Sequence, residues 1–115
     1  MSKRHRNRPR DAKVHASIFA ALGDPTRLAM LAKLADGAPQ SISRLAEGTH
    51  LTRQAVTKHL RVLENAGVVR STRVGRESQF ALDPKPLGDI RAYLDTVSRQ
   101  WDDALARLKS FAENR

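Results

Sequence analysis

The sequence predicts one mostly α-helical domain with a small β-hairpin. Its 115 residues fit the usual length of a single domain, about 100–200 residues. Five segments space their apolar residues three and four positions apart, as amphipathic helices do. A sixth segment is instead rich in β-branched residues around a glycine, which is typical of a hairpin. Because 40% of the residues are hydrophobic and 4% aromatic, we expect a core of Leu, Val and Ala.

The chain begins with a basic segment. Residues 1–11 are polar and charged and contain a proline, so we expect a disordered arm there and a folded domain over residues 12–112. From Ala12 onward, apolar residues at helical spacing predict a first, short helix that ends near Gly23. These residues are Val14, Ile18, Phe19 and Leu22.

Asp24 and Pro25 predict the start of a second helix. An aspartate side chain accepts bonds from free backbone N–H groups, and proline fits the first helical position. Gly37 and a following proline end this helix. Its expected apolar face consists of Leu28, Leu31, Ala32, Leu34 and Ala35. Arg27, in its first turn, is equally consistent with a phosphate contact and with an intramolecular salt bridge.

Two further helices follow, separated by a tight turn. The third begins at Ser41 or Ser43 and stops at Gly48. Thr52 is a suitable N-cap for the fourth, which stops at Gly67. The third helix bears the apolar residues Ile42, Leu45 and Ala46, and the fourth bears Ala55, Val56, Leu60 and Leu63. Two helices joined by a short turn that contains glycine form a helix-turn-helix candidate.

After the fourth helix the pattern changes to that of a hairpin. Residues 68–74 and 78–82 predict two strands. The tip between them, residues 73–76, is basic and contains a glycine. Residues 83–86 include two prolines and end the second strand.

The last helix is expected from Leu87 to Ala112. Its apolar residues form a nearly continuous heptad pattern at Leu87, Ile90, Leu94, Val97, Trp101, Ala104, Leu108 and Phe111. At 1.5 Å per residue it would be about 39 Å long, too long for one small domain to cover. A symmetric homodimer is the commonest way to bury such a face. The alternative is a helix that folds back on its own domain.

Basic residues are concentrated in two places. The formal net charge is +9, from 21 Lys and Arg against 12 Asp and Glu. Residues 1–13 carry six basic residues and one acidic residue, and residues 44–76 carry seven and two, so each segment contributes +5. Basic surfaces gain affinity for nucleic acids by releasing counterions from phosphates. The central segment therefore indicates a polyanionic partner, whereas the arm is equally consistent with a role in solubility.

The fourth helix makes DNA the favoured partner. Its outer face carries side chains that can hydrogen-bond base edges and phosphates, and residues near the N-terminus of a helix in the major groove approach the bases most closely. The residues expected at base edges are Arg53, Gln54 and Thr57. The residues expected at phosphates are Thr52, Lys58 and Arg61. In the hairpin, we expect Arg73 and Arg76 to reach flanking phosphates or a minor groove. The alternative is an ordinary solvated basic surface.

Three stretches resemble the ArsR-type bacterial repressors. Residues 22–27 (L-G-D-P-T-R) are similar to the family's opening motif, and residues 51–63 are similar to its recognition helix. Residues 66–69, followed by Gly75 and an arginine, are similar to its entry into the wing. The resemblance implies a winged helix-turn-helix homodimer that binds double-stranded operator DNA and blocks transcription, with the first and last helices forming the dimer. The residues then expected at the dimer interface are Val14, Ile18, Leu94, Val97, Trp101, Leu105 and Leu108.

Departures from that family argue against metal sensing. Many members sense metals or oxidants through cysteines, and this sequence has none. Others bind zinc on the last helix through an Asp-x-His pair, a later histidine and a glutamate. Counted from Asp89, the other three places hold Arg91, Asp102 and Leu105. Zinc needs about four N, S or O donors. No paired ligand spacing is found at His5, His15, His50 or His59, and His59 is expected to be a half-buried structural residue. We therefore expect neither a metal nor a cofactor.

Other functional classes find less support. The sequence lacks a glycine-rich phosphate loop, a nucleophile elbow and a patterned pair of carboxylates, so we do not expect an enzyme. No apolar run approaches the ~18 residues of a membrane span and no signal-peptide core is present, which favours a cytoplasmic protein without a membrane partner. The alternatives left open are a winged-helix module that binds RNA or another protein, and a repressor with a ligand pocket under the last helix. The sequence indicates no particular small-molecule effector.

Overall fold

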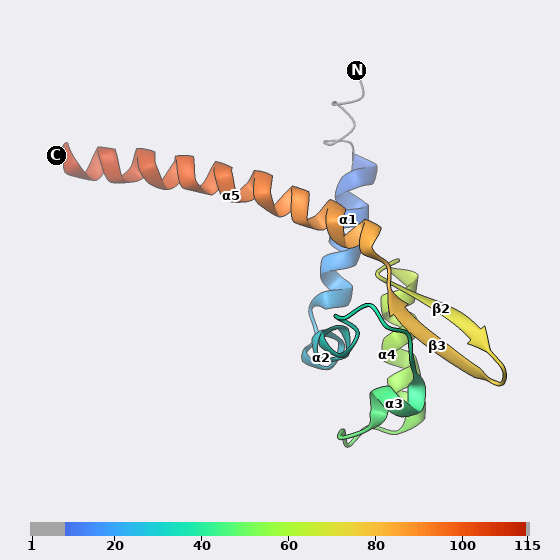
Figure 1. Cartoon of the computed structure of the whole chain (residues 1–115). Helices are drawn as coiled ribbons and strands as arrows, with labels where there is room; N and C mark the ends of the chain where they lie inside the picture. Colours follow the sequence, from blue (N-terminus) through green and yellow to red (C-terminus); the bar gives the residue numbers. More distant parts are fainter. Residues whose placement is uncertain (1–8, 115) are drawn as a thin grey trace. The chain divides into compact units, whose positions relative to one another are not determined.

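The computed structural model describes residues 9–114 of the chain. Within that range the elements are, in order, α1 (Pro9–Leu22), α2 (Pro25–Lys33), β1 (Gln40–Ser41), α3 (Ile42–Ala46), α4 (Arg53–Asn65), β2 (Val69–Val74), β3 (Glu77–Leu82) and α5 (Pro84–Glu113) (Figure 1). The predicted fold class, mostly α-helical with a small β-hairpin, is confirmed. Of the helices in residues 9–114, none combines the length and the apolar character that a membrane span requires.

The start of α1 differs from the sequence-based expectation. The helix begins at Pro9 rather than at Ala12, so residues 9–11 of the expected arm belong to it. Proline is well tolerated in the first turn of a helix, where its missing N–H has no intrahelical acceptor. The rest of that arm, residues 1–8, lies outside the described residues.

Three short polar side chains begin the helices of the central region. The side-chain oxygens of Asp24, Ser41 and Thr52 each accept a bond from the backbone N–H three residues further on, at 3.0, 3.1 and 3.0 Å. These bonds satisfy N–H groups that have no intrahelical partner. The N-caps predicted at Asp24 and Thr52 are therefore confirmed. For α3, where the sequence allowed either Ser41 or Ser43, the N-cap is Ser41. α2 ends at Lys33, earlier than Gly37.

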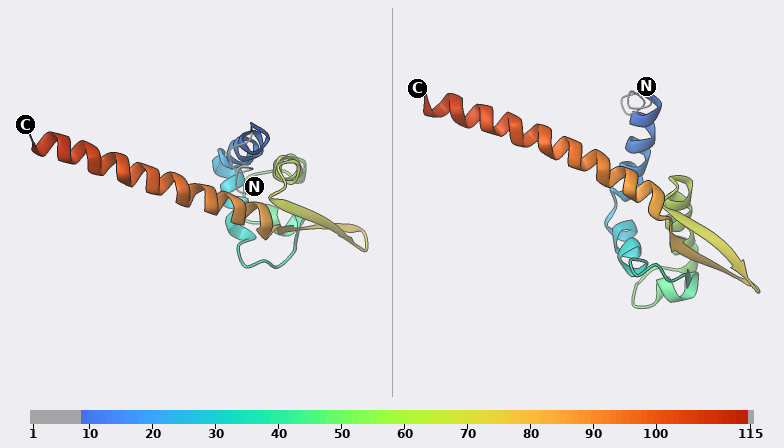
Figure 2. Two further views of the ribbon diagram at one scale, coloured as in Figure 1. Left: turned by 90° about the horizontal axis from the view of Figure 1, so that it is seen from above. Right: turned by 45° about the horizontal axis from the view of Figure 1, so that its top comes forward.

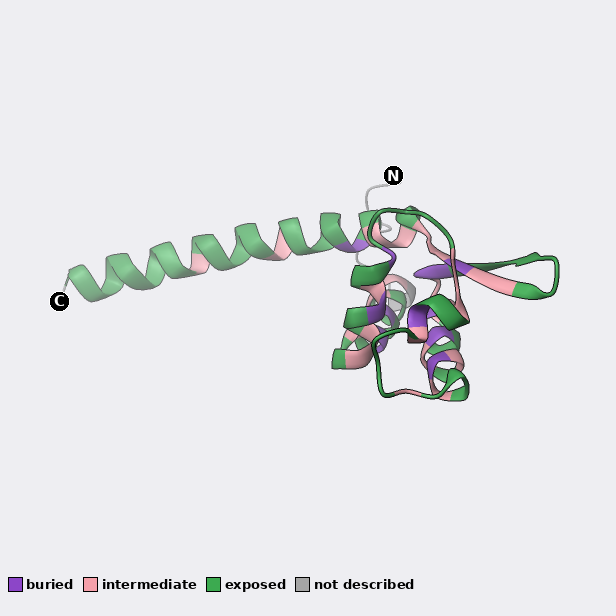
Figure 3. Ribbon diagram, turned by 60° about the horizontal axis from the view of Figure 1, so that its bottom comes forward, coloured by how far each residue is buried: buried purple, intermediate pink, exposed green. Residues whose placement is uncertain are grey.

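The core of the region up to Pro84 is built from all four short helices and the sheet (Figure 3). Its fully or almost fully buried side chains are Ile18, Ala21, Met30, Leu34, Leu45, Val56, Leu60, Leu63, Val68, Val69 and Phe80. The predicted inner face of the fourth helix is confirmed, because Val56, Leu60 and Leu63 are all buried. Leu28 was expected on the apolar face of α2, but it is 52% exposed and Met30 fills the core instead.

Ile18 requires a second correction. The sequence placed it at a dimer interface, but only 1% of its surface is exposed within a single chain. Ile18 therefore packs in the core of its own subunit and has no surface to offer to a second copy. Val14, on the same helix, is 51% exposed.

The sheet has three antiparallel strands in the order β1-β3-β2. β2 and β3 form the expected hairpin, with Val69 opposite Leu82 and Val74 opposite Glu77. This hairpin, called the wing below, projects beyond the helices around it (Figure 2). β1 was not predicted: its two residues pair with β3, with Gln40 opposite Phe80. A strand this short has no alternating pattern that could reveal it.

The chain divides into two compact units, residues up to Pro84 and residues from Lys85 onward. The second unit is α5, which begins earlier than the expected Leu87 because its prolines fall in the first turn. At 1.5 Å per residue its 30 residues extend over about 45 Å. Leu94, Trp101, Leu105 and Leu108 are exposed along it and Val97 is half-buried. These five residues are called the seam below.

Candidate nucleic-acid interface

Hydrogen bonds of the Thr49 hydroxyl hold the turn between α3 and α4 in place. The Thr49 hydroxyl donates to the Ala46 carbonyl oxygen at 2.6 Å and accepts from the Leu51 backbone N–H at 3.2 Å. Gly48 has a φ of +76°, a left-handed conformation that glycine adopts without strain. The turn is thus determined by its own residues, and it delivers the chain to the start of α4.

A lysine ties α2 to the end of α3. The ammonium group of Lys33 donates to the carbonyl oxygens of Leu45 and Glu47, each at 3.0 Å. Helix ends leave such carbonyls without an intrahelical donor. Lys33 is therefore occupied inside the protein, and α3 is held beneath α4 by a charged hydrogen bond as well as by packing.

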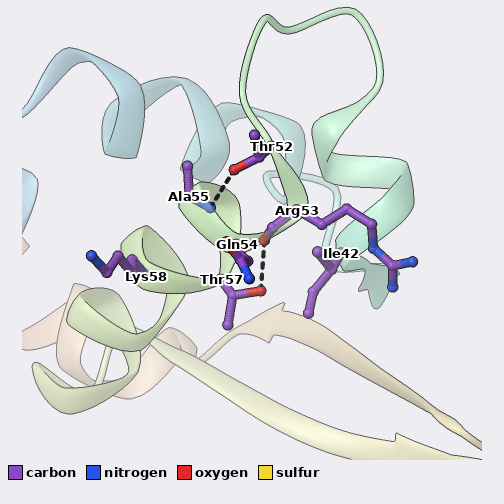
Figure 4. Close-up of a pocket in the computed structure, with 7 residues that line it drawn as sticks. All are labelled: Ile42, Thr52, Arg53, Gln54, Ala55, Thr57 and Lys58. Carbon is purple, nitrogen blue, oxygen red and sulfur yellow. Dashed lines mark hydrogen bonds between the residues drawn. The ribbon is translucent and has the colours of Figure 1, made fainter.

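The exposed N-terminal half of α4 faces an open surface hollow of about 690 Å³. The hollow is lined by Ile42, Thr52, Arg53, Gln54, Ala55, Thr57 and Lys58 (Figure 4). Five of the six residues that the sequence assigned to DNA on this helix thus lie at one surface. The sixth, Arg61, is not part of the lining.

The two threonines of the hollow already make one hydrogen bond each. The Thr52 hydroxyl oxygen accepts from the Ala55 N–H at 3.0 Å, so its own O–H remains free to donate. The Thr57 hydroxyl donates to the Arg53 carbonyl oxygen at 2.8 Å. Thr52 thus keeps a donor suited to a phosphate, whereas the donor of Thr57 is already used.

The cations of the hollow are unpaired. Neither Arg53 nor Lys58 makes an ion pair or a side-chain hydrogen bond with any other residue in the described part of the chain. Both side chains are exposed. Unpaired cations at the start of a helix are available to an anionic partner without breaking an internal contact.

Arg61 differs from these two residues. Its guanidinium lies 2.7 Å from the Glu64 carboxylate, which also accepts a 2.7 Å bond from the Ser71 hydroxyl on β2. The Ser71 bond, and then the Arg61 bond, hold the pKa of Glu64 below its ordinary value. Arg61 can reach a phosphate only by sharing or leaving this carboxylate. The Glu64–Ser71 bond also links α4 to the wing, a connection the sequence did not indicate.

The wing carries two exposed arginines near its tip. Arg73 lies on β2 opposite Ser78. Arg76 follows Gly75, which has a φ of +63°. Neither arginine has an ion-pair partner within residues 9–114, whereas Arg70 at the base of the wing lies 3.7 Å from Asp83. Among the arginines of this hairpin, the two at the tip are therefore the ones that present an uncompensated positive charge.

Arg27 resolves a question that the sequence left open. Its guanidinium donates to the carbonyl oxygens of Ala21 and Ala20 at the end of α1, and lies 3.4 Å from Nδ1 of His59. Arg27 is thus held within the protein, by backbone carbonyls rather than by a salt bridge. His59 is 25% exposed at its side chain and lies 3.9 Å from Asp24, so the expectation of a half-buried structural residue is confirmed. The Arg27 backbone N–H holds the pKa of Asp24 below its ordinary value.

Potential metal donors do not gather in this region. Among residues 9–114, no three His, Asp or Glu side chains come together in a group that could hold a metal ion. The α5 positions Asp89, Arg91, Asp102 and Leu105 include an arginine and a leucine, which supply no suitable donor. The residues present therefore do not fit a zinc site of that pattern.

Comparison with known proteins is consistent with this geometry. A family model described as a helix-turn-helix domain matches residues 22–72. The HTH-type transcriptional regulator Rv2034 of Mycobacterium tuberculosis is 39% identical over 87 residues, which are 76% of this chain and 78% of the relative. The HTH-type transcriptional repressor SmtB of the same species is 32% identical over 88 residues, 76% of this chain and 63% of the relative. The solved structure of an ArsR-like transcriptional regulator from Rhodococcus sp. RHA1 has 39% identity and a TM-score of 0.72, covering 88% of this chain and 94% of that one.

Proposed function

Since this chain belongs to the ArsR-type family of winged helix-turn-helix, DNA-binding transcriptional regulators, we propose that it is a dimeric repressor that binds an inverted-repeat operator. It regulates transcription and is not an enzyme. Repression is proposed because a relative with 32% identity is named a repressor, and because a protein seated in the major groove competes with other proteins for the same DNA.

The observation that carries the proposal is the exposed start of α4. Arg53 and Lys58 flank this surface without an internal ion pair among the described residues, and Gln54 is exposed between them. The major groove is wide enough for a helix. An arginine there pairs with guanine, and a glutamine pairs with adenine. We therefore assign base readout to Arg53 and Gln54, with Thr57 beside them, and phosphate contact to Thr52 and Lys58.

Arg61 and the wing complete the proposed footprint. Arg61 is assigned a phosphate contact that it shares with Glu64, so its contribution is smaller than that of Lys58. Arg73 and Arg76 have no such competitor within the described residues. We place them against the flanking phosphates or in a narrow minor groove, where the negative potential attracts arginine.

Dimerisation is assigned to the seam of α5. Burying exposed apolar surface contributes about 25 cal/mol per Å², and four of the five seam residues are exposed. A second copy of the same helix offers a matching stripe, and isologous pairing of two identical surfaces gives a closed dimer. Val14 of α1 remains a candidate contact to the second copy, whereas Ile18 does not.

We also propose that metal binding does not control this repressor. The chain contains no cysteine, and of the family's four zinc positions on the last helix only Asp89 keeps the family's residue type, while Arg91 and Leu105 offer no donor.

Footprinting on the DNA upstream of the protein's own coding region tests the proposal. We expect two protected segments related by an inverted repeat, with centres one helical turn or a whole number of turns apart. Arg53→Ala should abolish protection at a concentration that suffices for the wild type. The matched control Arg99→Ala removes the same charge from α5 and should keep the footprint. Protection of a single, non-palindromic segment would contradict a symmetric dimer.

A further inference from the structure

Ile42 occupies a place that its sequence pattern did not suggest. The sequence grouped it with Leu45 among the apolar residues of the third helix, but Ile42 is only half-buried whereas Leu45 is fully buried. Ile42 is the first residue of α3 and lines the hollow in front of α4. An aliphatic side chain therefore lies at the surface proposed to meet the bases.

Thr57 adds a second apolar group to the same hollow. Its hydroxyl is turned to the Arg53 carbonyl oxygen and bonded to it at 2.8 Å. Figure 4 shows the methyl group of Thr57 directed away from that bond, toward the same side as the end of the Ile42 side chain. The hydrogen bond thus fixes the threonine so that carbon, rather than oxygen, faces the partner.

The rest of the lining restricts what this apolar pair can bind. Arg53, Lys58 and the free hydroxyl proton of Thr52 surround it with cations and a donor, which suits a polyanion and not an apolar protein segment. In the major groove of unmodified DNA, the apolar group on a base edge is the 5-methyl group of thymine. A small apolar patch inside a basic, hydrogen-bonding surface matches that combination.

We propose that Ile42 and Thr57 form a contact for the thymine 5-methyl group and thereby determine specificity at one base pair of each half-site. The inference rests on the proposed function, since it requires α4 to lie in the major groove. It assigns direct readout to a residue outside the recognition helix, and it changes the role of Thr57 from a hydrogen-bonding residue to an apolar one.

Replacing thymine by uracil removes this methyl group and leaves every hydrogen-bonding atom of the base in place. Burying one methyl-sized group changes affinity about fourfold, so loss of the contact in both half-sites should weaken binding about fifteenfold. All other T-to-U replacements should have little effect. The test therefore isolates the proposed contact from the polar readout by Arg53 and Gln54.

The experiment begins with selection of the preferred duplex from random-sequence DNA by the wild-type protein. Each thymine pair of the half-sites is then replaced symmetrically by uracil, and dissociation constants are measured by fluorescence anisotropy at one salt concentration. We expect one position at which the wild type loses about fifteenfold. Thr57→Ser removes only the threonine methyl and should reduce this thymine preference, and Ile42→Ala should largely remove it.

Leu28→Ala is the matched control. It truncates an exposed aliphatic residue that does not line the hollow and should retain the full thymine preference. Thermal melting of each variant checks that the fold is intact. Because the readout is the ratio of the dissociation constants for the thymine and the uracil duplex, a difference in the concentration of active protein cancels. Conservative Ile42→Val, which keeps an aliphatic group, should preserve part of the preference.

The outcomes separate this inference from the function on which it rests. A selected site that binds equally well with thymine or uracil at every position would overturn the inference alone. So would a thymine preference that persists unchanged in Ile42→Ala. If selection yields no preferred sequence at all, the proposed function fails and the inference fails with it.

Discussion

Trp101→Ala tests whether the seam of α5 joins two copies of the chain. Trp101 is 63% exposed. Because a large aromatic side chain buries about 150–250 Å², about 95–160 Å² of Trp101 remains for a partner to cover. At about 25 cal/mol per Å² this amounts to about 2–4 kcal/mol for each subunit. Both subunits of a symmetric dimer lose it, and even half of the total raises the dimer dissociation constant about a hundredfold.

Sedimentation equilibrium over a range of protein concentrations measures that constant directly. Arg99→Ala is the control, since residues two positions apart on a helix lie on nearly opposite faces. Trp101→Ala should shift the protein toward the monomer, and its melting temperature at a given protein concentration should fall only by the stability that dimerisation supplied, because Trp101 is not part of the buried core. An unchanged dissociation constant, or equal dissociation of both variants, would refute the assignment of the seam.

Further expectations follow from the same geometry. Arg53→Ala should cost about 1–3 kcal/mol on the selected operator and flatten its preference among single-base variants, whereas Arg76→Ala should weaken all sequences alike and reduce the salt slope by about one. Competition binding on a panel of duplexes measures both, and uniform losses for both variants would contradict this division. Because Ser71 and Arg61 hold the pKa of Glu64 below its ordinary value, the ionised carboxylate stabilises the fold at neutral pH, and that contribution disappears as the pH falls below the ordinary pKa of glutamate, about 4.3, and through the lowered pKa of Glu64. Glu64→Gln should therefore lose less thermal stability than the wild type over that range, and parallel acid curves would be evidence against the link between α4 and the wing. Zinc or EDTA, added at constant ionic strength, should leave operator affinity unchanged, and a reproducible shift in the binding curve would overturn the proposal that metals play no part.

The features that the sequence predicted correctly depend on neighbours within one helical turn. Asp24 and Thr52 cap their helices through backbone N–H groups three residues away, a relation visible in the linear pattern. The buried face of α4 follows from spacing alone for the same reason. The polar and basic residues of α4 occupy the positions between the buried ones. The same spacing therefore predicted the candidate DNA-binding residues of this helix as one group.

What the sequence missed depends on distant partners. β1 exists because Gln40 pairs with Phe80, and two residues carry no period of their own. The apolar face of α1 predicted burial for Ile18 but could not tell a core from a dimer interface. Glu64 follows Arg61 by three positions on one helix, so the helical pattern could have predicted that ion pair. The Ser71 bond that holds the same carboxylate could not be predicted in this way, because it crosses from α4 to the wing.

Sequence-specific recognition of duplex DNA by α4 is the central claim, and a ratio of dissociation constants tests it most directly. The wild-type protein should be titrated, at one salt concentration, with the selected operator, with a random-sequence duplex of equal length and with a structured RNA. We expect the operator to bind about 10³-fold or more tightly than the random duplex, and the RNA to bind no better than random DNA. A ratio near one for all three would contradict the claim and indicate a basic surface that binds polyanions without reading their sequence.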